Sequence, residues 1–213
     1  MAADALTTFL LIRHALHELG GDTIAGRRPG VRLSPDGRVQ ADGLVPRLAG
    51  ISVDALYCSP MERTQQTAAP LAAGLGLTVQ TCEDLHEIDY GDWTGRRLDE
   101  LRGGEHWERW NSYRSGHRVP NGESMLHIQT RVMALLMRLR EEHRGERVAL
   151  VSHADVIKAA VSYCLGAPLD LFQRIEISPA SVSVVAVGDL GPWVLCVNNV
   201  GRLDGLPTLG TPG

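Results

Sequence analysis

The chain has 213 residues, of which 44% are hydrophobic and 22% charged, and its 25 acidic side chains outnumber its 21 Lys and Arg side chains. This length and apolar content can bury a substantial core, so we expect residues 1–200 to form one domain, followed by a disordered tail at 201–213. The net charge of −4 provides no global attraction for nucleic acid, so an anionic ligand would need a local basic cluster.

No apolar stretch reaches the roughly 18 residues that a membrane span needs, and residues 1–11 lack the basic start of a signal peptide. The cysteines form no C-x-x-C pair and no zinc-finger spacing. We therefore expect free thiols and a cytoplasmic protein with no membrane partner.

The first predicted element is a strand over residues 7–12, a β-branched and apolar run typical of a strand buried on both faces. This strand ends directly at Arg13 and His14. Residues 16–32 then contain Gly and Pro without an apolar period, which predicts a long irregular loop. Long loops inside compact domains are often functional.

The dipeptide Ser-Pro at 34–35 and again at 59–60 predicts the start of a helix, because Ser is a good N-cap and Pro suits the first helical position. The copy at 34–35 opens a helix whose apolar residues recur at helical spacing until Gly50. A second buried strand follows at 53–58. The copy at 59–60 then opens the next helix and places Arg63 in its first turn.

The rest of the chain continues this alternation of strands and helices. We expect a strand at 77–82, an irregular acidic and aromatic stretch at 83–95 and a weaker helix at 98–110. A long amphipathic helix is expected from 123 to about 144, followed by a strand at 148–152 and a helix from 154 to about 165. The last predicted element is a hairpin of strands at 181–187 and 193–198 with a longer loop. This order predicts an α/β fold with a mostly parallel sheet and helices on both faces.

Basic side chains follow three of the predicted strands where each strand ends. Arg13 and His14 end the first strand, Arg63 starts the helix after the second, and His153 follows the strand at 148–152. If these strands are parallel neighbours, the four groups meet at one edge of the sheet. Two guanidiniums and two imidazoles near helix N-termini would form an anion pocket, and a phosphoryl group matches their donors best.

Each of these residues also has a purely structural explanation. His153 alone could cap the helix that follows it, and Arg63 alone could be a solvated residue of a first helical turn. Independent structural roles would not often place all four groups at junctions between a strand and the segment that follows it, so the pattern favours the anion pocket.

Six short motifs follow one another over roughly residues 8–160. They are LIRHA at 11–15, LSxxGxxQA at 33–41, SPxxRxxxTA at 59–68, LxExxYGxWxG at 85–95, PxGES at 120–124 and VSH at 151–153. Their order and spacing resemble those of the histidine phosphatase superfamily, in its phosphoglycerate mutase-like branch. The resemblance implies a three-layer α/β/α fold and phosphoryl transfer through a phosphohistidine, with neither metal nor cofactor.

The resemblance also implies a role for each residue. His14 would be the nucleophile, held neutral by Arg13 and Arg63, which would also stabilise the phosphoryl oxygens, and His153 would donate to the same oxygens. Glu87 occupies the family's acid position. A bound phosphate dianion would raise the pKa of Glu87, so that this side chain protonates the leaving alkoxide and later activates water.

The chain departs from the family's pattern near the expected phosphate site. Gly20 stands where many members have a phosphate-contacting asparagine, and Ala154 and Asp155 replace a glycine-rich pair. His17 or the backbone around Gly26 could supply the missing donor. The backbone N–H of Ala154 could also contact the phosphoryl group, because it lies at the start of a helix.

Other residues remain candidates for parts of the site. Asp89 and Asp92 are fallback candidates for the acid. Four aromatic side chains could wall the pocket around an apolar leaving group, although aromatics at helical spacing are more often core: Trp93, Trp107, Trp110 and Tyr113. The expected ligand is a small-molecule phosphate ester, and the exposed edge of the C-terminal hairpin could support a homodimer.

Several other functions stay open from the sequence. A mutase must keep water from the phosphohistidine under a lid, and residues 93–122 are short for one, so hydrolysis is favoured. A metal hydrolase built on His14, His17, Asp22 and His153 would place two arginines beside a cation, and no H-E-x-x-H occurs. An inactive phospholigand-binding protein is a further alternative. A nucleotide-binding enzyme and a serine hydrolase lack the motifs G-x-x-x-x-G-K-[ST] and G-x-S-x-G.

Overall fold

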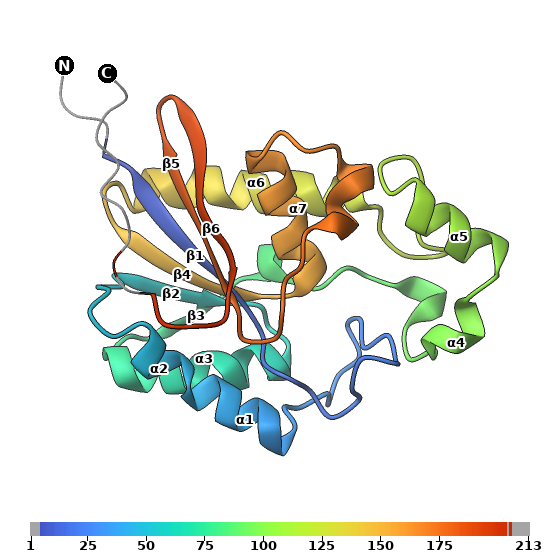
Figure 1. The fold of residues 1–213 in the computed structure, drawn as a ribbon, viewed down its shortest axis with the longest axis horizontal. Coiled ribbons are helices and arrows are strands. Elements are labelled where there is room, and N and C mark those ends of the chain that lie inside the picture. The colour runs from blue at the N-terminus through green and yellow to red at the C-terminus, as the bar shows by residue number, and fades with distance from the viewer. Residues whose placement is uncertain (1–4, 204, 206–213) are drawn as a thin grey trace.

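A six-stranded sheet forms the centre of the computed structural model, which describes residues 5–203 and 205 (Figure 1). The order of the strands across the sheet is β3-β2-β4-β1-β5-β6. In chain order the strands are β1 Thr7–Arg13, β2 Ala55–Cys58, β3 Val79–Thr81, β4 Arg147–Ser152, β5 Val182–Gly188 and β6 Gly191–Asn199.

The first four strands are parallel, and the C-terminal hairpin is not. β1 pairs in parallel with β4, β4 with β2 and β2 with β3, whereas β5 runs antiparallel to β1 and to β6. Arg13 at the end of β1 is the register partner of Ser152, and Cys58 at the end of β2 is the partner of Val151. The residues that follow these three strands therefore leave the sheet at the same edge.

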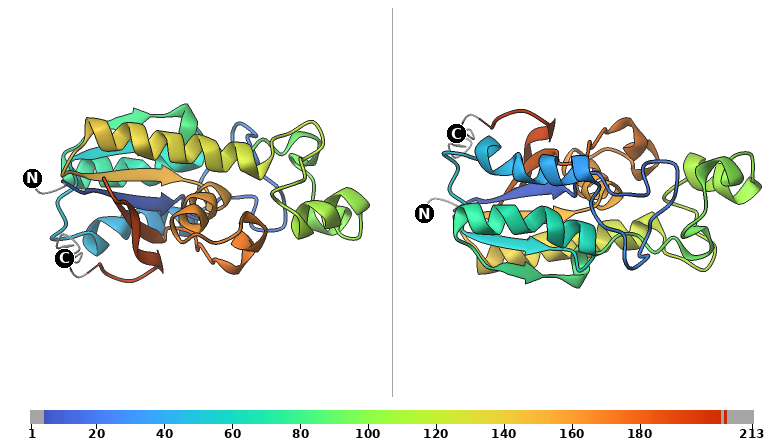
Figure 2. Two further views of the ribbon diagram at one scale, coloured as in Figure 1. Left: turned by 90° about the horizontal axis from the view of Figure 1, so that it is seen from above. Right: turned by 90° about the horizontal axis from the view of Figure 1, so that it is seen from below.

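Helices cover both faces of the sheet, which confirms the expected three-layer fold. The helices α1 Pro35–Asp42, α2 Leu44–Arg47 and α3 Glu62–Leu75 pack on one face, and α6 Met125–Glu142 and α7 Ala154–Cys164 pack on the other (Figure 2). Two short helices, α4 Leu98–Leu101 and α5 Glu105–Ser112, lie beyond the sheet edge at which β1, β2 and β4 end (Figure 1). Three 3₁₀ helices complete the elements, η1 Glu83–Leu85, η2 Gly91–Trp93 and η3 Leu169–Arg174.

Alternation along the strands separates two hydrophobic cores. Phe9 and Leu11 of β1 pack with the apolar side of α6, whereas Leu10 and Ile12 pack with α1, α2 and α3. Successive side chains of a strand point to opposite faces, so a strand covered by helices on both sides must be apolar throughout. This requirement explains the continuous apolar run that identified β1 in the sequence.

Two predicted helices are each broken into two. The helix expected from residue 34 to Gly50 splits at Gly43 into α1 and α2. Pro46 has no N–H to donate to the carbonyl of Asp42, so the hydrogen-bond ladder is interrupted there. The helix expected at 98–110 splits into α4 and α5 at Gly103, whose φ of 77° lies in the left-handed region.

Two further predictions are wrong in detail. The second Ser-Pro pair does not begin α3, whose N-cap is Met61, because the hydroxyl of Ser59 lies 2.9 Å from Nε2 of His153 instead. The hairpin loop is not long, since β5 ends at Gly188 and β6 begins at Gly191. The helix η3 was not predicted.

The structure also bears on the expectations about cysteines, membranes and the tail. All four cysteines are free, as predicted. Within 5–203 and 205, no helix is both long and apolar enough to span a bilayer. Most of the tail predicted to be disordered, 204 and 206–213, lies outside the described residues.

Candidate active site

A cavity of about 320 Å³ lies at the edge of the sheet where β1 and β4 end. Residues from distant parts of the chain line it: Arg13, His14, His17, Ile24, Ala25, Gly26, Arg63, Glu87, Tyr90, Leu98, Trp107, Trp110, Asn111, Arg114, Ala154, Asp155 and Gln173. The sheet-edge side of the cavity consists of the lining residues Arg13, His14 and Arg63 together with His153, which adjoins them. The aromatic side consists of Tyr90, Trp107, Trp110, Arg114 and Asp155.

His14 is held in one orientation directly after β1. Its Nδ1 lies 2.8 Å from the carbonyl oxygen of Ala15, so Nδ1 carries the proton and Nε2 keeps a lone pair. The hydroxyl oxygen of Thr67 accepts a hydrogen bond from the N–H of Ala15 at 3.0 Å and thereby fixes this turn. Burial lowers the pKa of His14 well below its ordinary value, and the charges of Arg63 and Arg13 lower it further. The imidazole is therefore neutral at neutral pH.

Arg63 is 1% exposed, and part of its hydrogen-bonding capacity is unused. Its Nη2 donates to the carbonyl oxygen of Gly26 at 2.8 Å and lies 3.2 Å from Nδ1 of His153. Nε and Nη1 are buried without an acceptor among the described residues. Arg13 shows the same pattern. Its Nη1 donates to the carbonyl oxygen of Ile177 at 2.6 Å, and its Nε has no acceptor among the described residues. Buried donors without acceptors are rare, which indicates that an anion belongs here.

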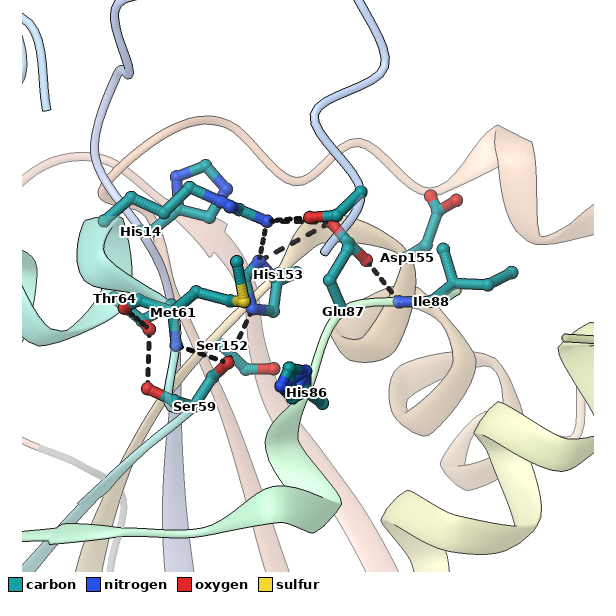
Figure 3. A network of polar contacts seen from close by, with 12 residues as sticks. His14, Ser59, Met61, Thr64, His86, Glu87, Ile88, Ser152, His153 and Asp155 are labelled. Carbon is teal, nitrogen blue, oxygen red and sulfur yellow. Dashed lines mark hydrogen bonds and ion pairs between the residues drawn. The ribbon is translucent and has the colours of Figure 1, made fainter. Parts of the chain in front are cut away.

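His153 lies beside His14, with ring centroids 5.2 Å apart (Figure 3). Arginine can only donate, so Nδ1 of His153 accepts from Arg63, and Nε2 donates to Oγ of Ser59 at 2.9 Å. Burial is the main cause that lowers the pKa of His153 well below its ordinary value, and Arg63 adds to it. The two imidazoles are thus both neutral, and the positive charges around them come from arginines.

Glu87 lies between His153 and Asp155 (Figure 3). Its Oε1 accepts from the N–H of Ile88 at 2.9 Å, and its Oε2 lies 3.5 Å from Nδ1 of His153. Burial raises the pKa of Glu87 to about 7, and the charge of Asp155 also raises it, against the opposing effect of Arg63. The carboxyl group therefore exchanges its proton near neutral pH, and burial is the leading cause even without a bound phosphate.

Three contacts hold the loop that carries Glu87. The hydroxyl of Ser152, at the end of β4, donates to the carbonyl oxygen of Leu85 at 2.8 Å. Arg27 donates from Nε to the carbonyl oxygen of Glu87 itself at 2.7 Å. Arg131 of α6 donates to the carbonyl oxygen of His86 at 3.0 Å. The irregular stretch predicted at 83–95 is therefore anchored to the sheet and to α6.

The aromatic side of the cavity is built by Tyr90 and by the segment that contains α5. The hydroxyl of Tyr90 donates to Oδ2 of Asp155 at 2.6 Å, and burial together with Asp155 raises the pKa of Tyr90 well above its ordinary value. Trp110 is fully buried. Arg114 is 3% exposed and lies with its guanidinium carbon 4.6 Å from the centroid of the Trp110 ring.

The family model of the histidine phosphatase superfamily (branch 1) matches residues 9–200 of the chain. The chain belongs to this superfamily. The family resemblance predicted from the six motifs is therefore confirmed, and the matched range contains every lining residue of the cavity.

Three relatives illustrate what superfamily members of this length do. Phosphoserine phosphatase 1 of Hydrogenobacter thermophilus is 30% identical over 199 residues, which cover 91% of this chain and 92% of that protein. A protein of Yersinia pestis named "Probable phosphoglycerate mutase GpmB" is 31% identical over 159 residues, or 73% of each chain. The crystal structure of the α-ribazole phosphatase from Shigella flexneri matches with a TM-score of 0.81 at 25% identity, covering 93% of this chain and 99% of that chain. Phosphatases and a mutase-type protein thus share this superfamily fold.

Most site residues predicted from the superfamily motifs line the same cavity. Arg13, His14, Arg63 and Glu87 do so together with three secondary candidates, His17, Gly26 and Ala154. His153 adjoins them through Arg63 and His14. The structure thus brings the predicted set together in one place.

The secondary candidates differ in what they can offer a ligand. The ring of His17 lies 5.5 Å from that of His14, and burial lowers the pKa of His17 to about 4. Its Nδ1 is buried without a partner in the described part of the chain. Gly26, in contrast, already uses its carbonyl oxygen as the acceptor for Arg63. His17 is therefore the better candidate for the donor that Gly20 does not provide.

Other candidates lie away from the cavity. Asp89 accepts from the N–H of Gly91, and Asp92 accepts from the side chain of Asn121, so both fallback acids are engaged elsewhere. Trp93 packs behind Trp107 and Trp110 rather than lining the cavity, and Tyr113 is 53% exposed. Among residues 5–203 and 205, no three His, Cys, Asp or Glu side chains are grouped as metal ligands.

Sequence reasoning missed several lining residues as functional candidates. Tyr90 stands inside a family motif, so its motif position could have indicated a role. Arg114 and Gln173 had no such signal, because both lie in irregular or short 3₁₀ segments. Asp155 was noted only as a departure from the superfamily pattern.

Proposed function

We propose that this chain is a phosphatase that hydrolyses small-molecule phosphate monoesters through a phosphohistidine at His14, without a metal or cofactor. The observation that carries the proposal is the neutral, oriented imidazole of His14 beside the buried and unpaired donors of Arg13 and Arg63. A phosphoryl group would satisfy these donors and place its phosphorus within reach of the Nε2 lone pair.

In the first step, Nε2 of His14 attacks the phosphorus atom, and the bond from phosphorus to the ester oxygen breaks. Arg13 and Arg63 stabilise the charge on the phosphoryl oxygens. The carbonyl oxygen of Ala15 keeps its hydrogen bond to Nδ1–H and so stabilises the positive charge that the phosphorylated ring acquires. A bound dianion raises the pKa of His153, which allows a proton on its Nδ1 to be donated to the same oxygens.

The leaving alkoxide takes its proton from Glu87. Burial raises the pKa of this carboxyl group to about 7, so a large fraction is protonated at neutral pH. In the second step the Glu87 carboxylate removes a proton from water, and the resulting hydroxide attacks phosphorus as the bond to Nε2 breaks. Inorganic phosphate leaves, and both Glu87 and His14 return to their starting forms.

Hydrolysis is favoured over mutase chemistry by the charge around the cavity. A mutase must hold a substrate with two phosphoryl groups, and the second group also needs cations. Among the described lining residues, the aromatic side offers one cation, Arg114, and its Nη1 lies 3.8 Å from the carboxylate of Asp155. Asp155 offsets part of the charge of Arg114, so a second phosphate dianion would be only partly neutralised there.

The test is hydrolysis of p-nitrophenyl phosphate in the presence of EDTA by the full chain. We expect activity, and we expect His14→Ala to reduce it by at least about 10³-fold, because the nucleophile is lost. The matched control is His127→Ala, since His127 is an exposed histidine of α6. Acid-labile, base-stable labelling of the wild-type chain by phosphorylated substrate is expected, and none on His14→Ala.

Other results would overturn the proposal. Activity that appears only after a divalent metal is added would assign metal-dependent chemistry. Full activity in His14→Ala would show that His14 is not the nucleophile. Incubation with 3-phosphoglycerate, followed by phosphorus NMR, separates hydrolysis from isomerisation, because isomerisation keeps the ester and hydrolysis releases inorganic phosphate.

A further inference from the structure

Arg114 is a buried arginine on the aromatic side of the cavity with unused donors. It follows α5, and its side chain is 4% exposed. Nη2 donates to Oδ1 of Asn111 at 2.6 Å, but Nε and Nη1 have no acceptor among residues 5–203 and 205. The guanidinium carbon lies 4.6 Å from the ring centroid of Trp110 and 5.0 Å from that of Phe172. The aromatic faces hold the cation in place without satisfying its N–H groups.

Asp155 does not complete the hydrogen bonding of Arg114. Its Oδ2 lies 3.8 Å from Nη1, which is longer than a hydrogen bond, and the same oxygen accepts the hydroxyl of Tyr90 at 2.6 Å. Asp155 therefore offsets part of the charge but leaves the donor free. A buried guanidinium in this state is unfavourable unless an acceptor arrives.

The same signature appears on the opposite side of the cavity. Arg63 is also buried, also lines the cavity, and also has Nε and Nη1 without an acceptor in the described chain. There the proposed ligand is the phosphoryl group. Arg114 repeats the pattern on the side where the alcohol portion of a substrate would lie, since it belongs to the segment beyond the sheet edge.

The chemistry of this second position favours a single negative charge. Arginine N–H groups match the oxygens of carboxylates and phosphates. A phosphate dianion would meet the nearby carboxylate of Asp155 with only one cation to balance it, whereas a carboxylate carries one charge and requires only one donor group. The cavity volume of about 320 Å³ is large enough for a phosphoryl group with a short alcohol portion.

We propose that Arg114 binds a carboxylate on the alcohol portion of the substrate, so that the preferred substrates are phosphate monoesters of small hydroxycarboxylic acids. This inference rests on the proposed function, because it names the substrate class of the same cavity. Arg114 is then the specificity-determining residue, and Tyr90 and Asp155 shape the wall beside it.

The test uses two probes of the same length that differ in one group, a carboxylate in 3-(phosphonooxy)propanoate and a neutral amide in 3-(phosphonooxy)propanamide. For the wild-type chain we expect kcat/KM to be at least about tenfold higher for the carboxylate, since a hydrogen bond to a charged partner exceeds one to a neutral amide. In Arg114→Met the ratio is expected to fall to near one. The matched control is Arg109→Met, because Arg109 is an exposed arginine of α5 that pairs with Glu105, and it should keep the wild-type ratio.

Equal kcat/KM for the two probes in the wild-type chain would overturn the inference without any variant. An unchanged ratio in a folded Arg114→Met chain would do so as well, with folding checked by circular dichroism and thermal unfolding. If Arg114→Met does not fold, Arg114→Lys keeps the charge and provides the second variant, with an expected ratio below that of the wild type. Faster hydrolysis of glycerol 1-phosphate than of the carboxylate probe would instead assign the Arg114 and Asp155 pair to hydroxyl binding.

Binding measurements separate this inference from the proposed function. The probes 4-phosphonobutanoate and 4-phosphonobutanamide keep the chain length of the two esters and cannot be hydrolysed, and calorimetry should show tighter binding of the carboxylate to the wild type and to His14→Ala. If p-nitrophenyl phosphate is not hydrolysed but this preference is present, the proposed function fails alone. If p-nitrophenyl phosphate is hydrolysed and the preference is absent, only the role of Arg114 fails.

Discussion

The two sides of the cavity are built in different ways. On the sheet-edge side, Arg13 ends β1, and His14 and His153 directly follow the hydrogen-bonded parallel strands β1 and β4, so the register of the sheet sets their spacing. On the aromatic side, Trp110 comes from a short helix and Arg114 from the loop after it, and Arg114 contacts Phe172 of η3 and Asp155 of α7. A site that performs one reaction can therefore keep a rigid half for the reacting group and a more variable half for the rest of the substrate.

The largest difference between the two sides should appear when a sheet-edge cation is removed. We expect Arg63→Met to lower kcat/KM by about 10²–10³-fold for every phosphate ester, because in the proposed mechanism Arg63 stabilises the transferring group itself. Arg114→Met should instead lower kcat/KM for the ester that carries a carboxylate and leave kcat/KM for the amide ester nearly unchanged. The measurement is kcat/KM for p-nitrophenyl phosphate, 3-(phosphonooxy)propanoate and 3-(phosphonooxy)propanamide. Arg102→Met is the control, because Arg102 is exposed. A loss at Arg63 confined to carboxylated esters would contradict the division.

Glu87 lies between the two sides, and its removal should depend on the leaving group. Glu87→Gln is expected to slow alkyl esters such as glycerol 2-phosphate by about 10²–10³-fold, because an alkoxide needs a proton. For p-nitrophenyl phosphate the loss of kcat/KM should be less than about tenfold, since p-nitrophenolate leaves without a proton and kcat/KM does not include hydrolysis of the phosphohistidine. Steady-state kinetics on both esters provide the measurement. Asp92→Asn is the comparison variant, and a similar leaving-group dependence there would move the acid to Asp92.

The pH profile should report the carboxyl group of Glu87. Burial raises its pKa to about 7, so the protonated form is lost above that pH. We expect kcat/KM for alkyl esters to fall about tenfold per pH unit on the basic side, after correction for ionisation of the ester. Asp155 raises the same pKa, so Asp155→Asn should move the fall to lower pH. A profile that persists unchanged in Glu87→Gln would exclude this assignment.

The smallest expected effect concerns stability. Burial and Arg63 hold the pKa of His14 and of His153 well below the ordinary value of 6.5, so below pH 6.5 the unfolded chain binds more protons than the folded chain. The contribution of each histidine is fully present above pH 6.5 and is lost as pH falls, with a slope of up to about 1.4 kcal/mol per pH unit.

The raised pKa of Glu87 acts in the opposite sense, because its contribution is greatest below about pH 4.5 and is lost as pH rises to about 7. His14→Ala should therefore flatten the fall in unfolding free energy between pH 6.5 and 5. Urea denaturation at several pH values measures this change. His127→Ala should keep the wild-type slope, and equal slopes in all three chains would contradict the neutral burial of His14.

The comparison also shows how far the sequence could predict the site. The strand ends were predictable because a continuous apolar run followed by a polar residue is a local pattern, and His14 and His153 each follow such a run. The positions of Arg63 and Glu87 were accessible through the motifs. The contact of Ser59 with His153 was not, because it joins residues 94 positions apart and replaces the capping role that the local pattern predicted for Ser59.

Tyr113 and Arg114 show the limit most directly. From the sequence, Tyr113 could wall the pocket or belong to the core, yet Tyr113 is 53% exposed and the adjacent Arg114 is 3% exposed. The irregular backbone after α5 has no periodicity from which a buried face could be inferred. Arg114 is buried because Trp110, Phe172 and Asp155, from three separate segments, surround it.

The amino-acid sequence by itself determined the strands, the superfamily and the group that surrounds His14, because each depends on short patterns whose physical meaning is local. Only the tertiary structure decided which side chains face His14 across the cavity, how Glu87 is buried, and that Arg114 retains unpaired donors. Those properties depend on packing between segments far apart in the chain, and burial, which controls both pKa and hydrogen-bond satisfaction, is a property of that packing.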